Sequence, residues 1–287
     1  MKILIAISSW QNGARKGYNQ SQRDTWIQDL KKYHNVDYRF FVGDGKPTGE
    51  DEGALHSTFQ QVVQGHTQQP EHIKGISVTG FTPQDDEVVL SNVPDDYMHV
   101  TFKDKAILRW AYKEWYDFIF ICDADTYVDV DKLMHSGFEN HDYSGFPFGI
   151  FGAEGMGYWL SRKCIPLIVD EPVHVWGADQ FIGDVLLKKG VRLHPMWTYR
   201  EWPLVPRKSN DITTCHLGAP SNLYTADRMY EVHRDNQIPR QEGERFMVYD
   251  SPCGHPTHTP AQAGDSPPPQ PAPVANTLRQ PRRIRRA

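Results

Sequence analysis

The feature that most constrains the fold is the stretch at residues 118–125, where five apolar or small residues lead into Asp123-Ala124-Asp125. Such a run is typical of a strand buried on both faces, as in a parallel sheet. Open α/β sheets bind ligands at the carboxyl ends of their strands, so the two aspartates stand where a site is expected. Paired carboxylates there favour a hard cation with a phosphate-bearing ligand. From these residues alone, a polar turn after the strand is an equally open interpretation.

The order of segments along the chain predicts an α/β fold, because strands alternate with a helix that leads directly into the next strand. The expected strands are residues 3–7, 36–42, 118–122 and 156–161, and the expected helices are residues 103–115 and 179–189. In the first helix we expect Ala106, Ile107, Trp110 and Ala111 on the buried side. In the second, Ile182, Val185 and Leu186 form the inner face, and Gly190 suits the position just after the helix.

Other segments carry weaker local signals. Residues 9–20 suggest a polar loop, and Ser21-Gln22-Arg23-Asp24 fits a capping box ahead of a helix at residues 25–30. Residues 46–80 suggest a long connection, and residues 128–134 could start another helix. The glycine-rich residues 152–158 lack the spacing of a dinucleotide or P-loop fingerprint. They favour a sharp turn that lets a sugar approach the backbone.

Charge is distributed unevenly along the 287 residues. The formal net charge is −5, but five arginines against one aspartate give residues 251–287 a charge of +4 and leave −9 on the body. An acidic body argues against a main domain that binds nucleic acid. We expect one globular domain at residues 1–250 and a disordered, Pro-rich, Arg-ended tail at 251–287. Binding of that tail to an anionic membrane surface or to nucleic acid is the alternative to a solvated tail.

The cellular compartment is inferred from the four cysteines and from the apolar run at residues 3–7. No pair of cysteines has C-x-x-C spacing, which argues against a zinc ribbon. Cys122 is expected to be a small core residue, and a Cys164–Cys215 disulfide stays open. The apolar run at residues 3–7 is too short for a membrane span and lacks a signal-peptide cleavage pattern. We therefore expect a cytoplasmic protein, or one of the Golgi lumen if the chain is trimmed.

Two further residues are candidates for chemistry. His216, near the end of the predicted body, could be a metal ligand beside carboxylates or an ordinary histidine. Asp179, at the start of the predicted helix, could be a first-turn carboxylate stabilised by the helix dipole. It could also be a general base whose proton affinity is raised by burial, and both interpretations can hold together.

Seven short motifs follow one another over residues 3–218. They are Ile3-Leu4-Ile5-Ala6-Ile7-Ser8-Ser9, Arg23-Asp24-Thr25-Trp26, Asp96-Tyr97-Met98-His99-Val100-Thr101-Phe102-Lys103, Asp123-Ala124-Asp125-Thr126-Tyr127-Val128, Gly155-Met156-Gly157-Tyr158-Trp159-Leu160-Ser161-Arg162, Ala178-Asp179-Gln180-Phe181-Ile182-Gly183 and Cys215-His216-Leu217. In this order they resemble the motifs of glycosyltransferase family 31, the fringe and β1,3-galactosyltransferase-like enzymes. The fourth is similar to the metal-binding Asp-x-Asp motif of that family.

The resemblance implies a GT-A fold, with a Rossmann-like mixed sheet flanked by helices, and an inverting transfer from a UDP-sugar to a hydroxyl of a glycan acceptor. The donor sugar would be of the galactose or N-acetylhexosamine type. The resemblance implies Mn²⁺ held by Asp125 and His216, with Asp179 as general base. It implies donor contacts from Ser8, Ser9, Arg23, Asp44, Lys103, Asp123 and Ala124.

Two other functions remain open from the residues. Asp123-Ala124-Asp125-Thr126 also fits the Asp-x-Asp-x-Thr motif of haloacid-dehalogenase-type phosphatases, in which Asp123 would attack phosphorus and Asp125 would act as acid. That motif usually lies near the start of a chain, whereas here about 120 residues precede it. The third possibility is a protein that binds a nucleotide-sugar without turning it over.

Overall fold

The computed structural model describes residues 1–48, 80–148, 152–200, 212–218 and 225–237. Its centre is a seven-stranded sheet with the strand order β3-β2-β1-β4-β7-β6-β8. The strands are β1 (Ile3–Ser8), β2 (Val36–Gly43), β3 (Glu87–Leu90), β4 (Phe118–Asp123), β6 (Tyr143–Phe148), β7 (Gly152–Ser161) and β8 (His194–Pro195). Strand β1 runs parallel to β2 and β4, whereas β7 is antiparallel to β4 and β6. The predicted α/β fold with a mixed sheet is confirmed.

The central strand β1 is buried along its whole length. Leu4 and Ala6 belong to the hydrophobic cluster on one face of the sheet, and Ile3, Ile5 and Ile7 belong to the cluster on the other face. The two-residue period of a strand divides the side chains in this way. A strand covered on both faces has a continuous apolar run, which explains why this strand and β4 could be predicted.

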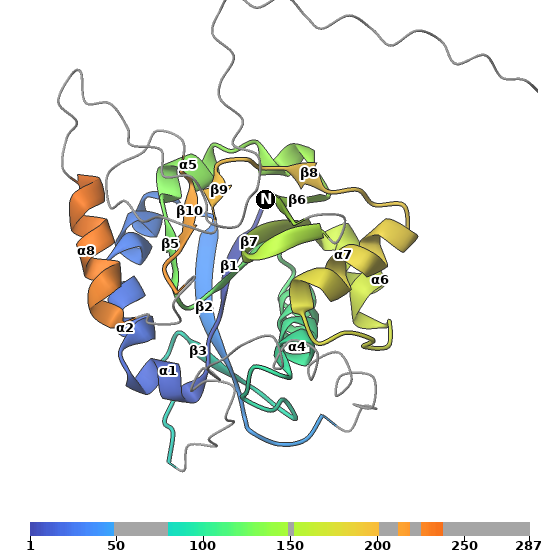
Figure 1. Cartoon of the computed structure of the whole chain (residues 1–287), viewed down its shortest axis with the longest axis horizontal. Helices are drawn as coiled ribbons and strands as arrows, with labels where there is room; N and C mark the ends of the chain where they lie inside the picture. Colours follow the sequence, from blue (N-terminus) through green and yellow to red (C-terminus); the bar gives the residue numbers. More distant parts are fainter. Residues whose placement is uncertain (49–79, 149–151, 201–211, 219–224, 238–287) are drawn as a thin grey trace, which may run out of the picture. The chain divides into compact units, whose positions relative to one another are not determined.

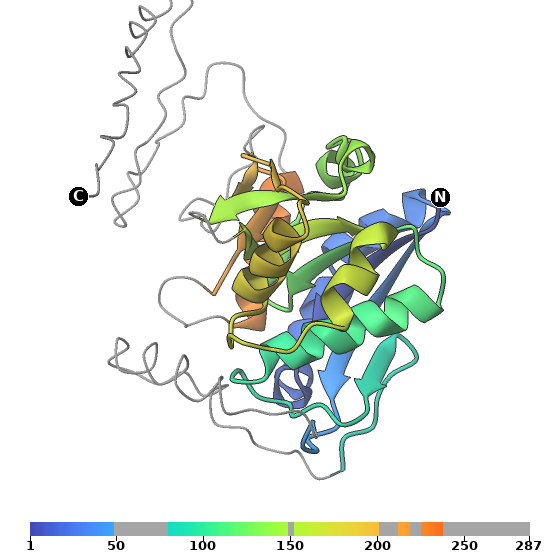
Figure 2. The same ribbon diagram turned by 90° about the vertical axis from the view of Figure 1, so that its right-hand side faces the viewer.

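Helices cover both faces of the sheet (Figures 1 and 2). On one face, α4 (Val100–Lys113) contacts α6 (Ile165–Val169) and α7 (Ala178–Lys188), and α7 also packs on β7. The other cluster takes residues from the 3-10 helix η1 (Trp26–Lys32), α5 (Val130–Met134) and α8 (Ala226–Gln237). The remaining helices are α1 (Gln11–Arg15), α2 (Tyr18–Arg23), η3 (Phe138–Asn140) and η4 (Arg162–Cys164).

A second, three-stranded sheet has the order β5-β10-β9. Its strands are β5 (Thr126–Val128), β9 (Tyr199–Arg200) and β10 (Thr214–His216). Strand β5 begins directly after Asp125, so its antiparallel pairing with β10 returns a distant part of the chain to the end of β4.

Several local predictions were wrong around the first helices. Residues 9–20 form α1 and the start of α2 instead of a loop. Ser21 lies inside α2 and donates its hydroxyl to Tyr18 O at 2.8 Å, so it caps no helix, and the helix expected at residues 25–30 is the 3-10 helix η1. Helix α4 begins at Val100 and ends at Lys113, close to the prediction.

The glycine-rich residues 152–158 also differ from the prediction, because they belong to strand β7 and make no turn. Gly157 has φ +150°, and a Cβ there would overlap the ring of Phe120. The close packing of two strands therefore requires this glycine. The prediction for Gly190 is confirmed, since it follows α7 with φ +82°.

Cys122 is buried, which confirms the prediction of a small core residue. Cys164 and Cys215 are also buried, and both are free, so the disulfide that the sequence left open is not formed. Cys164 belongs to one hydrophobic cluster and Cys215 to the other. The predicted tail at 251–287 and most of the connection at 46–80 lie outside the described residues. Within the described part of the chain, no helix has the length and apolar character needed to cross a membrane.

Candidate active site

The site begins where β1 and β4 end side by side. Ser8 pairs with Asp123 in the parallel register, and Ala124 N donates to Ser8 O at 3.0 Å. The chain leaves β1 for β2 on one side, whereas β4 lies on the other side, so this pair of strand ends is a topological switch point of the sheet. Ligands of open α/β sheets bind at such points. Asp123 thus ends a strand, as the sequence predicts, and Ser8 and Ala124 lie beside it, while their contacts with a donor stay predictions.

Three candidate metal ligands come together at this edge. The ligand atoms of Asp123, Asp125 and His216 all lie within 4.8 Å of one another. His216 Nε2 is 3.0 Å from Asp125 Oδ2. This contact depends on the pairing of His216 with Thr126, and Leu217 N also donates to Asp125 O at 2.9 Å. The structure thus brings the predicted ligands Asp125 and His216 together and adds Asp123 to them.

Gly218 lies against the same cluster. A Cβ at position 218 would overlap Asp125 Oδ2 and lie 3.5 Å from His216 Nε2. The Asp125 carboxylate therefore occupies the space that a side chain at position 218 would need, and glycine at this position lets it lie beside His216. Two carboxylates and an imidazole suit a divalent cation such as Mn²⁺, because oxygen ligands and imidazole nitrogen are typical of such sites.

Electrostatics also favour a cation here. Burial raises the pKa of Asp123, and the negative charge of Asp125 raises it further, while His216 opposes the shift. Asp104 and Asp179 add to the increase. Two adjacent, partly buried carboxylates repel each other, and a bound cation would relieve that repulsion.

Asp179 is connected to this cluster through Gly155. It is the second residue of α7, and its Oδ1 accepts a hydrogen bond from Gln180 N at 2.7 Å. Burial raises the pKa of Asp179, and hydrogen bonds from the amides of Gln180 and Gly155 oppose that increase. A Cβ at Gly155 would lie 3.6 Å from Asp123 Oδ2. Gly155 therefore lies between the two carboxylates, and its lack of a side chain leaves the space between them open.

Lys103 supports the loop after β1. Its side chain is buried, and its Nζ donates to Ser9 O at 2.6 Å and to Asp95 Oδ1 at 3.0 Å. Asp95 in turn accepts from Gln11 N at 2.6 Å and from Gly43 N at 2.7 Å. These contacts fix the ends of β1 and β2. They make Lys103 a residue that positions Ser9, and direct contact with a diphosphate stays a prediction.

Two predicted donor-binding residues have other partners. Arg23 donates Nε and an Nη to Asp86 at 2.8 and 2.6 Å and an Nη to Glu87 at 2.8 Å. Asp44 accepts from the amides of Lys46, Asn92 and Val93 at 3.0–3.2 Å. Burial alone would raise the pKa of Asp44, but these hydrogen bonds outweigh it, and the pKa is lowered. The contacts of both residues order the ends of β2 and β3, and their donor contacts stay predictions.

The structure adds residues that the sequence did not single out. Although Tyr97 is 38% exposed as a whole residue, burial of its phenol and the charges of Asp123, Asp179 and Asp125 raise the pKa of that phenol. Tyr97 belongs to the motif at residues 96–103, which was a usable signal. Gln22 is fully buried and donates its amide to Ala124 O and, at 3.5 Å, to Asp123 O. Nothing in the sequence pattern indicated that Gln22 supports the loop after β4.

No protein-family model matches the chain, and the search of curated proteins found no match. Among solved structures, a glycosyltransferase involved in the glycosylation of the major capsid of PBCV-1 is 12% identical, covers 82% of this chain and 100% of its own, and has a TM-score of 0.42.

The galactosyltransferase LgtC, in complex with donor and acceptor sugar analogues, is 13% identical, covers 84% of this chain and 98% of its own, and has a TM-score of 0.41. The mannosyltransferase PcManGT from Pyrobaculum calidifontis, in complex with GDP-Man and Mn²⁺, is 8% identical with 68% and 54% coverage and a TM-score of 0.38. All three are glycosyltransferases. At 8–13% identity and TM-scores of 0.38–0.42, these likenesses are distant.

Proposed function

We propose that this chain is a metal-dependent glycosyltransferase that moves a sugar from a UDP-sugar to an acceptor hydroxyl with inversion at the anomeric carbon. The observation that carries the proposal is the cluster of Asp123, Asp125 and His216, whose ligand atoms lie within 4.8 Å of one another at the switch point of the sheet, together with the partly buried Asp179 carboxylate at the start of α7. The seven sequence motifs of the chain resemble those of glycosyltransferase family 31. That resemblance supports a GT-A arrangement and a galactose or N-acetylhexosamine donor.

The residues present fit a divalent cation. Asp125 and His216 would hold it, with Asp123 on the nucleotide side, and Gly218 lets the Asp125 carboxylate lie beside His216. When bound, the cation would offset the negative charge that develops on the UDP leaving group.

Asp179 is suited to accept a proton. In the proposed transfer, the acceptor oxygen forms a bond to the anomeric carbon, the bond from that carbon to UDP breaks, and the hydroxyl proton passes to the Asp179 carboxylate. Burial raises the pKa of Asp179, which makes it a stronger base than an exposed aspartate. Attack from the side opposite the UDP inverts the anomeric centre.

The loop after β1 supplies the donor side. Lys103 holds Ser9 O, and Ser9 Oγ donates to Asn19 Oδ1 at 2.6 Å, so the backbone beside Asp123 is preorganised. Preorganised polar groups need no rearrangement when charge develops during the reaction. Ser8 and Ser9 are therefore the proposed donor contacts with the most direct support.

The experiment is a panel of UDP-sugars assayed for UDP release with Mn²⁺, with EDTA as the control. Mn²⁺-dependent release with one donor supports the proposal. Release of phosphate from simple phosphomonoesters, abolished by Asp123→Asn, would favour the phosphatase instead. Mn²⁺-dependent binding of UDP-sugars without release under any acceptor condition would favour a binding protein.

A further inference from the structure

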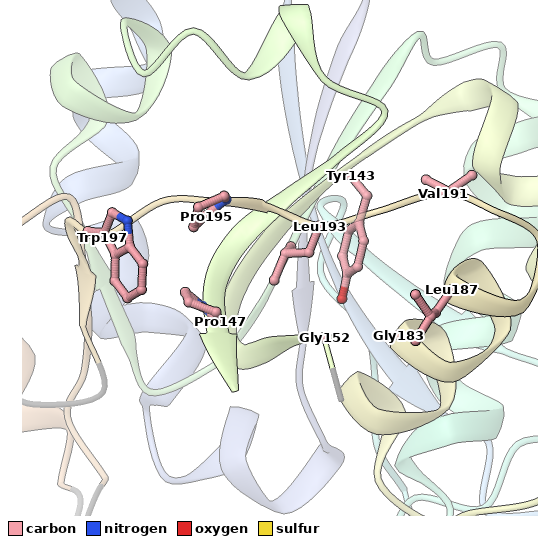
Figure 3. A pocket seen from close by; sticks show the side chains of 9 residues that line it. All are labelled: Tyr143, Pro147, Gly152, Gly183, Leu187, Val191, Leu193, Pro195 and Trp197. Carbon is pink, nitrogen blue, oxygen red and sulfur yellow. The ribbon is translucent and has the colours of Figure 1, made fainter. Parts of the chain in front are cut away.

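The candidate site is supported from α2, on the opposite side of the sheet from α7 (Figures 1 and 2). A concave region of about 310 Å³ beside α7 has an apolar lining that includes none of Asp123, Asp125 and Asp179 (Figure 3). Helix α2 packs on α8, and two of its polar residues, Asn19 and Gln22, are fully buried. Buried polar side chains have hydrogen-bond partners in almost all proteins, so the partners of these two residues indicate their role.

Asn19 holds the loop after β1. Its Oδ1 accepts a hydrogen bond from Ser9 Oγ at 2.6 Å, and its Nδ2 donates to Glu87 Oε1 at 2.9 Å. Ser9 N donates to Phe41 O at 2.9 Å, and Ser9 O accepts from Lys103 at 2.6 Å. The backbone amide, the carbonyl and the side chain of Ser9 are therefore all held, and Asn19 is the partner of the side chain.

Gln22 holds the loop after β4. Its Nε2 donates to Ala124 O and, at 3.5 Å, to Asp123 O. Ala124 N donates to Ser8 O at 3.0 Å, so the backbone of Ala124 is fixed through both its amide and its carbonyl. Residues three apart lie on the same side of a helix, so Asn19 and Gln22 reach the two loops from one face of α2.

The other polar atom of Gln22 indicates why glutamine is present. Gln22 Oε1 is buried and has no hydrogen-bond partner among the residues that the structure describes. An unpaired buried carbonyl lowers stability, and an aliphatic side chain of similar size would fill the same space without that cost. The advantage of glutamine over such a side chain is the Nε2 donor that holds Ala124 O.

We propose that α2 fixes the spacing of the two loops, with Asn19 and Gln22 as positioning residues for the donor side of the site. The inference rests on the proposed function and adds two residues that act through the loops after β1 and β4. Ala124 stands between Asp123 and Asp125, so a fixed Ala124 backbone limits the orientations that both carboxylates can take. Residues that hold metal ligands in place contribute about 10–100-fold to metal affinity.

The test uses Gln22→Met, which keeps the approximate size of the side chain and removes the donor to Ala124 O. The unpaired Oε1 disappears together with the partner of Ala124 O, so Tm should change by less than about 4 °C. The Kd for Mn²⁺ alone, measured by electron paramagnetic resonance, and the Kd for UDP with Mn²⁺, measured by calorimetry, should each rise about tenfold. Gln20→Met is the matched control, because Gln20 is exposed on the same helix and its amide bonds to Asp24 at 2.8 Å.

Asn19→Leu tests the other loop. It removes the partner of Ser9 Oγ, so the Kd for UDP with Mn²⁺ should rise about threefold or more, while the Kd for Mn²⁺ alone stays within about twofold. In transfer assays, both Asn19→Leu and Gln22→Met should raise the KM for the donor and change kcat by less than about threefold. The reason is that Asp179 is placed by α7 and not by α2.

Several results would overturn the inference. Unchanged affinities in Gln22→Met contradict its positioning role even if the variant is less stable, because both Kd values are measured on folded protein well below Tm. A fall in kcat without a rise in donor KM contradicts the expected split. In Asp125→Ala, adding Gln22→Met should cause little further loss of Mn²⁺ affinity, and a fully additive loss would show that Gln22 does not act through the metal ligands.

Mn²⁺ binding separates this inference from the proposed function. Mn²⁺ binding that weakens in Gln22→Met, in a protein that binds no UDP, contradicts the proposed function alone. Mn²⁺-dependent UDP release with no effect of Gln22→Met or Asn19→Leu contradicts the positioning role of α2 alone. A protein that binds no Mn²⁺, with or without UDP, contradicts both.

Discussion

His216 Nε2 lies 3.0 Å from Asp125 Oδ2, although the two residues are 91 positions apart in the sequence. The contact is made by two short strands, because His216 on β10 pairs with Thr126, the residue directly after Asp125. A histidine held against a carboxylate by backbone pairing is positioned before any ligand arrives. A preorganised ligand pair of this kind binds a cation with less loss of side-chain freedom.

Removing this carboxylate should weaken binding of the metal with the nucleotide. Asp125→Ala deletes one of the three ligand atoms, so the Kd for UDP in the presence of Mn²⁺ should rise at least about tenfold. Calorimetric titration of UDP with and without Mn²⁺ measures the effect. Asp131→Ala is the control, because that carboxylate is 59% exposed and pairs with Lys32 on the surface. Unchanged UDP affinity in Asp125→Ala would contradict its metal role.

A small substitution tests the position of the Asp125 carboxylate. In Gly218→Ala the added Cβ would overlap Asp125 Oδ2, so either the carboxylate or the chain after β10 has to move. We expect Mn²⁺-dependent UDP affinity to fall by about tenfold or more. Gly137→Ala is a useful comparison for the stability cost of losing a glycine, since Gly137 has φ +77° and lies at the start of η3. A Gly218→Ala protein with normal Mn²⁺-dependent binding would show that this position of Asp125 is not needed.

The proposed base can be separated from binding. Asp179→Asn keeps the size of the side chain but removes its capacity to take a proton, so transfer should fall by about 10²–10⁴-fold. UDP binding with Mn²⁺ should change by less than about threefold. Asp184→Asn, on the same helix and beside His174, should keep transfer activity. Equal loss of binding and transfer in Asp179→Asn would contradict the assignment.

Asp104 should make stability depend on pH. Burial raises its pKa to about 7, while hydrogen bonding from Tyr158 and the charge of Lys103 limit the increase. In the unfolded chain an aspartate releases its proton near pH 4. Between about pH 4 and 7 the folded protein therefore binds more protons than the unfolded chain, and the free energy of unfolding falls as pH rises.

Asp104→Asn removes this contribution, so the decrease between pH 4 and 7 should become shallower. Urea denaturation at several pH values, in EDTA, measures both proteins under the same conditions. Asp123, whose pKa is also raised, keeps part of the slope in the variant. An identical pH dependence for the two proteins would contradict the proposed titration of Asp104.

The Lys103–Asp95 pair should matter for folding. Both side chains are buried, at 6% and 3% exposure, and Lys103→Met would leave the Asp95 charge without its cation. We expect the free energy of unfolding to fall by about 3 kcal/mol. Lys46→Met, which removes a surface ion pair with Asp44, should cost less than about 1 kcal/mol. Similar small losses for both variants, measured by urea denaturation, would contradict the role of the buried pair.

The parts of the fold that could be predicted are those with a strong local pattern. Strands β1 and β4 are buried on both faces, so their apolar runs identified them and placed Asp123 at a strand end. Helix α4 and the position of Gly190 after α7 followed from periodicity and backbone preference. The prediction for residues 9–25 was wrong because the two short helices in this segment are stabilised by tertiary contacts, such as the packing of α2 on α8.

The features of the candidate site can also be separated into those that depend on local sequence and those that depend on tertiary contacts. The sequence by itself determined the Asp-x-Asp pair after an apolar strand and a carboxylate at the start of a helix, because both depend on neighbouring residues. Only the tertiary structure decided that His216 and Gly218 meet Asp125, that Gly155 links Asp123 to Asp179, and that Lys103 holds Ser9. It also paired Arg23 with Asp86 and Glu87. Such contacts arise from strand pairing and from the need of buried charges for partners, and neither is written in a local pattern.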